Sequence, residues 1–259
     1  MSIWGKMIGG VAGFALGGPI GALLGALAGH AVDKMRVSGE PIAEGYAGVG
    51  PGAGFQEYDQ QSRQMAFTVA VIALSAKLAK VDGRVTRDEI DAFKRAFNIP
   101  PEEMESVGKL FNEAREDSTG FEPYADQIAR IFSRDPAMLE ELLGALLHIA
   151  HADGEYHPNE RDFLARVAAI FGFGPTAFER MEATFLQGKD AVDPYQVLGV
   201  DKSISDEDLK SEYRRLMREH HPDRLVAEGL PEEMIELANE QVAAINAAYD
   251  KIRKQRGIK

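Results

Sequence analysis

The sequence predicts an all-α protein with a single N-terminal transmembrane helix, a helical bundle in the middle and a helical hairpin at the C-terminus. Three observations predict this arrangement: an uncharged N-terminal run, an internal repeat of helix, turn and helix, and two apolar stripes with helical spacing. We therefore divide the chain into an anchor (1–36), a tether (37–63), the bundle (64–186), a linker (187–192) and the hairpin domain (193–259).

Composition limits the classes of function. The 259 residues suffice for two modest domains, and the formal net charge of −12 argues against a nucleic-acid partner. The chain has no cysteine, so it forms no disulfide, which fits a reducing compartment. It also contains neither a phosphate-binding loop of the G-x-x-x-x-G-K type nor the kinase motifs. We expect neither enzymatic activity nor a cofactor.

The anchor is predicted from residues 7–32, which include no Lys, Arg, Asp or Glu. This run exceeds the roughly 20 residues that cross a bilayer. Glycine recurs at every fourth position, which favours close approach of a second helix and predicts a homodimer. The predicted dimer face consists of Gly9, Gly13, Gly17, Gly21 and Gly25. A cleaved signal peptide and a soluble Gly/Ala-rich segment are the alternatives.

The next segment, residues 37–63, predicts a tether rather than a folded element. It is rich in Gly and Pro, as in Gly48-Val-Gly-Pro-Gly-Ala-Gly54, and no helical or strand period persists along most of it. Such a composition is typical of a flexible connection between an anchor and a folded body.

An internal repeat organises the bundle, because residues 78–90 align with residues 149–161. Each copy reads as an apolar helix, an Asp-Gly turn and a second helix, and the glycine ends the first helix in left-handed geometry. The matched residues are Asp82, Gly83 and Glu89 in one copy and Asp153, Gly154 and Glu160 in the other. This pattern resembles the TerB-like domain, and the resemblance implies a small bundle of two such hairpins.

The acidic residues of the repeat have two interpretations. In the first they cap helices, with Thr86 and Glu89 forming one capping box and His157 and Glu160 its variant. In the second, which the TerB-like resemblance raises, carboxylates of both copies hold a hard cation. The candidate ligands are Asp82, Glu89, Asp153 and Glu160. Their spacing lacks the alternating acids of a calcium loop, which favours capping.

The tripeptide His221-Pro222-Asp223 lies between two amphipathic helical patterns. The apolar stripes are Leu209, Tyr213, Leu216 and Met217 before it, and Ala238, Val242, Ile245, Tyr249 and Ile252 after it. Helices that bury such stripes against each other form an antiparallel hairpin, so the tripeptide lies at its tip. Pro222 restrains His221 to extended geometry and ends the first helix.

A basic face runs along the first helix of the hairpin. Lys210, Arg214 and Arg218 recur at every fourth position, and Arg215 lies beside them. Such a face can guide association with an acidic partner, and an ordinary solvated helix surface is the alternative. The tripeptide likewise has simpler interpretations, as a helix breaker or as a catalytic or metal-binding His-Asp pair, but no nucleophile or third ligand accompanies it.

Residues 193–259 resemble a J domain. The resemblance rests on Asp193-Pro-Tyr-Gln-Val-Leu-Gly-Val200, Tyr213-Arg-Arg-Leu216, the tripeptide and Ile245-Asn-Ala-Ala-Tyr249. It implies that the partner is an Hsp70 of the DnaK type and that the tip stimulates ATP hydrolysis by that partner. The implied contact residues are His221, Pro222, Asp223, Lys210, Tyr213, Arg214, Arg215, Arg218 and Asn246.

The order of anchor, tether, TerB-like bundle and J domain resembles the membrane-anchored DnaJ-like co-chaperones of the DjlA type. Trp4-Gly-Lys6 and the insert Leu225–Met234 behind the tripeptide support the resemblance. It implies a single-pass protein of the bacterial inner membrane with the bulk of the chain in the cytoplasm, which recruits Hsp70 to the lipid surface. General client binding of the DnaJ kind is not expected, because the chain has no Gly/Phe-rich linker and no Cys-x-x-Cys zinc region.

Two other functions remain open from the sequence. The protein could be mainly an oligomeric membrane scaffold, held together by the glycine face of the anchor. It could also be a metal-dependent stress sensor or enzyme that acts through the TerB-like domain.

Overall fold

The computed structural model describes residues 17–23, 60–81, 90–91, 93–94, 99–152, 154, 156–186 and 193–258. The regular elements in these ranges are all helical, as the sequence predicts. Most of the predicted tether and the whole of the predicted linker lie outside the described residues, as do Asp82, Glu89 and Asp153 of the proposed metal set and Gly9, Gly13 and Gly25 of the predicted dimer face.

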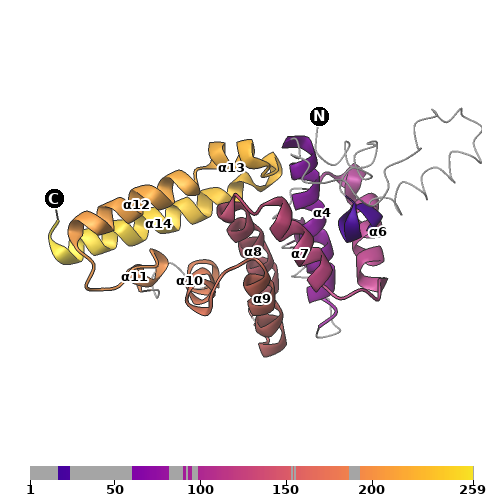
Figure 1. Cartoon of the computed structure of the whole chain (residues 1–259), viewed down its shortest axis with the longest axis horizontal. Helices are drawn as coiled ribbons and strands as arrows, with labels where there is room; N and C mark the ends of the chain where they lie inside the picture. The colour runs from indigo at the N-terminus through magenta and orange to yellow at the C-terminus, as the bar shows by residue number, and fades with distance from the viewer. Residues whose placement is uncertain are drawn as a thin grey trace, which may run out of the picture.

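The bundle is arranged around helix α4, which is buried along almost its whole length from Met65 to Leu78 and contacts α6, α7 and α8 (Figure 1). A second layer is formed by α9 and α10, which pack on α8. Proline occupies the first position of α8, α9 and α10, where its missing N–H costs no helical hydrogen bond. The helices are α4 (Gln60–Leu78), η1 (Pro101–Glu103), α6 (Met104–Glu116), α7 (Glu122–Ile131), α8 (Pro136–Ala150), α9 (Pro158–Ile170) and α10 (Pro175–Leu186).

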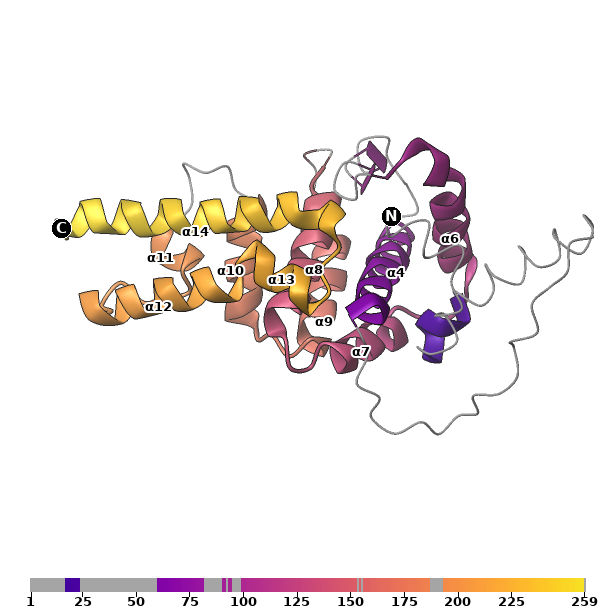
Figure 2. The same ribbon diagram turned by 90° about the horizontal axis from the view of Figure 1, so that it is seen from above.

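The hairpin domain follows as α11 (Pro194–Val197), α12 (Asp206–Glu219), α13 (Pro222–Glu228), η2 (Glu232–Met234) and α14 (Ile235–Arg256). Helices α12 and α14 lie side by side in both views (Figures 1 and 2). The side chains of Leu209 and Leu216 are buried against those of Ile245 and Ile252, so both predicted stripes are confirmed at their centres. Ser205 caps α12 by accepting a hydrogen bond from the N–H of Asp208, at 3.1 Å.

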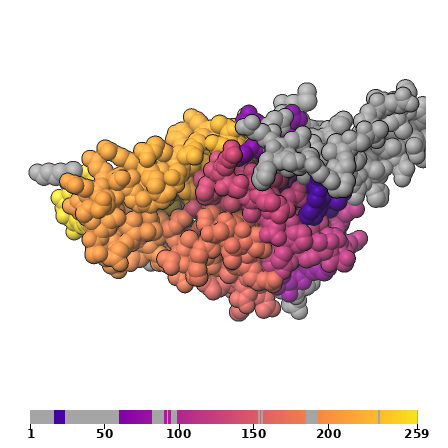
Figure 3. Space-filling view, viewed as in Figure 1, coloured from indigo at the N-terminus to yellow at the C-terminus, as the bar shows by residue number. Residues whose placement is uncertain are grey.

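The insert after the tripeptide joins the two domains. Residues 222–228 form helix α13, which packs on α4 and α8 of the bundle. Leu225, Leu230 and Met234 are each about 1% exposed and belong to the same hydrophobic core as the bundle, together with Ala238 of the second stripe. The hairpin domain therefore lies directly against the bundle (Figure 3), and its insert completes the bundle core, while α12 and the rest of α14 form a second hydrophobic cluster.

Helix α4 begins at Gln60, inside the range predicted as tether. Its first turn is polar because it faces α13 rather than the bundle core. The Nε2 atom of Gln60 donates to the carbonyl of Val226 at 2.9 Å, and Nε of Arg63 donates to the carbonyl of Glu228 at 2.6 Å. These polar residues have no apolar period, so the sequence pattern places the start of the helix too late.

A short helix at residues 18–23 lies against the bundle and is the described part of the predicted anchor. Ile20 and Leu23 join the bundle core, and Gly21 of the predicted dimer face is buried there as well. Within the described residues, no helix combines the length and the apolar character needed to cross a membrane.

Candidate functional site

The tripeptide forms a fixed turn between α12 and α13. His221 has extended backbone geometry (φ −64°, ψ 126°), and Pro222 is the first residue of α13. The Nδ1 atom of His221 accepts a hydrogen bond from the N–H of Asp223 at 3.2 Å, so His221 caps α13. The side chains of His221 and Asp223 remain 54% and 94% exposed. The tip is therefore rigid in its backbone and open to a partner.

The basic face of α12 points to solvent. Lys210, Arg214 and Arg218 are exposed and make no ion pair with any residue that the structure describes. Arg215 differs, because its guanidinium pairs with the carboxylates of Glu212 and Glu219 on the same helix. Of the four cations that the sequence predicts on this face, Lys210, Arg214 and Arg218 therefore supply most of the positive potential next to the tip.

Tyr213 and Asn246 join the two long helices of the hairpin. The hydroxyl of Tyr213 donates to Oδ1 of Asn246 at 2.7 Å, and its ring stacks on that of Tyr249 with centroids 4.0 Å apart. Both residues of the hydrogen bond are half-buried. Their contacts hold α12 against α14, which sets the direction of the basic face.

The one described member of the proposed metal set is Glu160. Its side chain is 2% exposed, and its Oε2 atom accepts a hydrogen bond from the N–H of His157 at 2.9 Å, as the capping interpretation predicts. Gly154 has a φ of 84°, the left-handed geometry predicted at the end of the preceding helix. Among the described residues, no three His, Asp or Glu side chains are grouped so that they could hold a metal ion.

A buried polar cluster fastens the hairpin domain to α8, one residue before the tip. The Nδ1 atom of His220 lies 3.2 Å from Oε1 of Glu141, and its Nε2 lies 3.8 Å from Oε1 of Glu140. Gln241 of α14 donates to the same oxygen of Glu140 at 3.1 Å, and Arg180 of α10 donates to it at 2.7 Å. All these side chains except that of Arg180 are under 10% exposed.

Both partners of the His220–Glu141 pair hold their protons more tightly than in water. Burial raises the pKa of Glu141, although the hydrogen bond from His220 opposes this effect. For His220, burial alone would lower the pKa, but the hydrogen bond to Glu141 and the charges of Glu140 and Glu141 outweigh it and raise the pKa. Both shifts therefore favour keeping a proton on the pair.

These shifts predict that alkaline pH weakens the contact between the two domains. A group whose pKa is raised by folding stabilises the folded state below its unfolded pKa, about 6.5 for histidine, and loses that contribution as the pH rises through the folded value. The unfolding temperature of the chain should therefore fall from about pH 6 to about pH 9 by more than that of a His220→Gln/Glu141→Gln variant. Thermal unfolding followed by circular dichroism measures the difference, and equal slopes would contradict the assignment.

Arg63 makes a second fastening between the domains. Its guanidinium bonds to the carbonyl of Glu228 and to the carboxylate of Asp135, and it lies over the ring of Phe132 at 4.7 Å. Gly229, which ends α13 with a φ of 113°, approaches it so closely that an added Cβ would lie 2.8 Å from Cβ of Arg63. Only glycine fits both the backbone geometry and the space at this position.

Sequence reasoning did not find these fastening residues. The bonds from Gln60 and Arg63 to α13 join positions more than 160 apart in the chain, which no local pattern reveals. One signal was present, because Glu140 and Glu141 interrupt the leucine-rich sequence of residues 138–147. Buried carboxylates require partners, and this requirement points to an interface.

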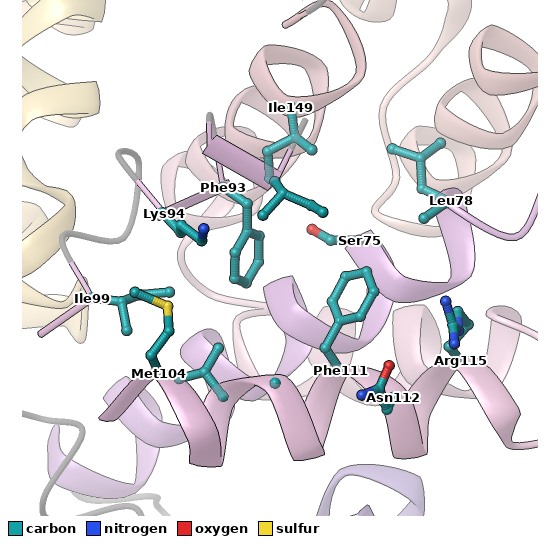
Figure 4. Close-up of a pocket in the computed structure, with 14 residues that line it drawn as sticks. Ser75, Leu78, Phe93, Lys94, Ile99, Met104, Phe111, Asn112, Arg115 and Ile149 are labelled. Atoms are coloured by element: carbon teal, nitrogen blue, oxygen red, sulfur yellow. The ribbon is translucent and has the colours of Figure 1, made fainter. Parts of the chain in front are cut away.

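A separate cavity of about 280 Å³ opens between α4, α6 and α8, and no residue of the hairpin domain lines it (Figure 4). Its walls are mostly apolar and include the rings of Phe93 and Phe111, which meet edge to face. The hydroxyl of Ser75 points into this space, and it is a buried oxygen for which the described part of the chain offers no hydrogen-bond partner.

We expect Ser75→Ala to stabilise the protein by about 1 kcal/mol, because burying an unsatisfied hydroxyl costs free energy that alanine avoids. Urea unfolding of both proteins measures the change. Thr68→Ala is the matched control, since the Thr68 hydroxyl on the same helix donates to the carbonyl of Gln64 and its loss should not stabilise the chain. Destabilisation by Ser75→Ala would show that the hydroxyl is satisfied in solution.

Comparison with known families agrees with this architecture. Residues 1–50 match the model of the co-chaperone DjlA transmembrane domain, residues 68–183 that of the tellurite resistance protein TerB, and residues 193–256 that of the DnaJ domain. The hairpin domain is thus a J domain. No solved structure matches the chain.

Similar proteins match along their whole length. The co-chaperone protein DjlA of Photobacterium profundum is 35% identical over an alignment of 283 residues, and this alignment covers 99% of this chain and 100% of the relative. Those of Vibrio cholerae and Yersinia pestis are 33% and 31% identical, over the full length of both chains. With three matching domains in the same order and relatives of this similarity, the chain belongs to the DjlA family of co-chaperones.

Proposed function

We propose that this protein stimulates ATP hydrolysis by a DnaK-type Hsp70 and recruits that Hsp70 to the cytoplasmic face of the inner membrane. The observation that carries the proposal is the exposed His-Pro-Asp tip, fixed by its cap on α13, beside the exposed basic face of α12. The protein itself would perform no catalysis and would need no cofactor. Its role is to bind the Hsp70 and shift it toward hydrolysis.

The arrangement of the two domains supports this role. The bundle covers the insert and the buried side of His220, whereas Lys210, Arg214 and Arg218 point to solvent. An acidic Hsp70 surface can therefore approach α12 without displacing the bundle. Opposite charges across such an interface raise the rate of encounter.

Single-turnover ATP hydrolysis by a bacterial Hsp70 tests the proposal. The full chain, placed in lipid nanodiscs, should accelerate hydrolysis over nanodiscs alone. The absence of acceleration at concentrations that saturate other J proteins would overturn the proposal. A scaffold function would then be the better account of the family's membrane domain.

Reversing one charge of the basic face should slow the encounter with Hsp70. We expect Arg214→Glu to lower the association rate about tenfold at low salt, with a smaller effect at high salt because ions screen the exposed charges. Lys254→Glu is the matched control, since Lys254 is also exposed but lies in the last turn of α14, at the far end of the hairpin from the tip. Stopped-flow fluorescence measures both association rates. An equal decrease in the two variants would show that the effect comes from the net charge of the protein.

We also propose that residues 1–36 cross the inner membrane once, with the bulk of the chain in the cytoplasm, and associate as a homodimer. The match of residues 1–50 to the DjlA transmembrane domain supports an anchor, and ATP and Hsp70 are cytoplasmic. Protease added to spheroplasts should leave the J domain intact. Cross-linking in nanodiscs should yield a dimer that Gly21→Leu reduces, and a monomer throughout would remove the dimer from the proposal.

A further inference from the structure

Part of the anchor occupies a site on the TerB-like bundle. Residues 18–23 form a short helix against the bundle, drawn in indigo in Figures 1 and 2. Ile20 and Leu23 are 0% and 5% exposed and belong to the bundle core, whereas Ala22 is exposed. One face of this short helix is thus buried against the bundle, as a bound ligand would be, and the other face is exposed to solvent.

The polar centre of this site is Gln127 of α7, which is 5% exposed. Its Oε1 atom accepts a hydrogen bond from the N–H of Ile20 at 3.0 Å, and its Nε2 atom donates to the carbonyl of Gly17 at 2.8 Å. Both bonds go to the peptide backbone. The first N–H groups of any helix lack partners within the helix, so a side-chain amide placed here recognises a helix start without reading its sequence.

The site still imposes a size limit on its ligand. A Cβ atom on Gly18 would lie 2.6 Å from Oε1 of Gln127, and the residue has a φ of 59°. The ligand therefore needs glycine at this position and aliphatic side chains two and five residues later. Gly/aliphatic helices of this kind are common in membrane-spanning segments and rare in water-exposed ones.

The bilayer and the bundle compete for the same residues. If residues 1–36 cross the membrane as proposed, Ile20 and Leu23 lie among lipid chains and cannot also fill the bundle core. The anchored protein then exposes a groove shaped for a glycine-containing apolar helix. The insert that follows the His-Pro-Asp tip is part of the bundle core, so a helix bound there would be held at a fixed position relative to that tip.

We propose that the surface around Gln127 is a client-binding site of the TerB-like domain. Its ligand is a glycine-containing apolar helical segment of another membrane protein, presented to the Hsp70 recruited by the J domain. In a chain outside the membrane, the protein's own residues 17–23 fill the site. The inference rests on the proposed co-chaperone function and membrane anchoring.

The first experiment tests the site itself, with a fluorescent peptide of residues 15–25 carrying terminal lysines as the probe. The full-length Ile20→Asp/Leu23→Asp chain, without lipid, cannot fill its own site and should bind the peptide, whereas the wild type without lipid should not. Adding Gln127→Met to the double variant should weaken binding about tenfold through loss of two hydrogen bonds. No binding by the double variant would overturn the proposal.

Matched controls distinguish specific binding of the peptide from nonspecific adsorption and from misfolding of the variants. Asp126→Asn, at an exposed neighbour of Gln127, should leave binding unchanged, and Gln127→Met keeps an unbranched side chain of similar length so that the bundle can fold. In the peptide, Gly18→Val should abolish binding while Ala22→Val should not, because only the first faces Gln127. Equal losses with both peptides would overturn the assigned geometry.

The second experiment tests whether anchoring empties the site. Nanodiscs that contain one wild-type chain each should bind the peptide above the level of empty nanodiscs, and dilution to one chain excludes occupation by a second copy. If the double variant binds and these nanodiscs do not, the site exists but anchoring does not release it, and the client role is overturned. ATP hydrolysis measured in the same nanodiscs without peptide reports the proposed co-chaperone function independently.

Discussion

His221→Gln is expected to reduce Hsp70 stimulation to the basal rate, the largest functional effect of any single substitution in this chain. The side chain of His221 is 54% exposed, so its replacement removes surface that a partner can reach rather than part of the core. Single-turnover hydrolysis measures the effect. The free energy of unfolding of the same sample, measured by thermal unfolding, should stay within about 1 kcal/mol of the wild-type value, which is the usual contribution of a helix cap.

Ala227→Gln provides the control for this substitution. It places the same new side chain at an exposed position within α13, the helix that His221 caps, and should leave stimulation unchanged. If both variants lost stimulation, the cause would be a disturbance of α13. If neither did, the tripeptide would act only as the helix breaker between α12 and α13.

His220→Ala is expected to give the largest loss of stability, about 3–5 kcal/mol, because it leaves the carboxylate of Glu141 buried without its partner. Urea unfolding measures the loss. Because the insert completes the bundle core, the wild type should unfold in one cooperative transition, and the variant should show two as the domains separate. Removing a charge partner at the surface would cost far less.

The neighbouring histidine is the matched control for stability. His221→Ala removes the same kind of side chain one residue later, where it is exposed, and should cost no more than about 1 kcal/mol. Equal losses at the two positions would show that the interface opens in solution. His220→Gln should give an intermediate loss, since an amide can still donate to Glu141.

The elements of the fold and the centre of the candidate site follow from local sequence patterns. The stripes that contain Leu216 and Ile245 predict the hairpin because each helix repeats its own apolar period. The turn at Pro222 follows from the covalent geometry of proline, and the capping role of Glu160 follows from its spacing to His157.

The contact between the domains did not follow from the sequence. Leu225 and Leu230 are scattered in a short segment, residues 225–234, that also contains three glutamates, a glycine and a proline, so their burial has no periodic signature. Arg215 and Tyr213 likewise read as contact residues, whereas their charge and hydroxyl are engaged within the hairpin. Each of these outcomes depends on partners that only the folded chain brings near.

The core shared by the bundle and the insert limits how this protein can change in evolution. Leu225, Leu230 and Met234 belong to the J domain in the sequence, but they complete the interior of the neighbouring bundle. Recombination near residue 190, between the two domains, would join a bundle and an insert from different parents. One recombinant chain would then have a cavity in its bundle core, and the other would expose leucines of the insert. Chimeras between relatives should therefore fold only when the insert and the start of α4 come from the same parent.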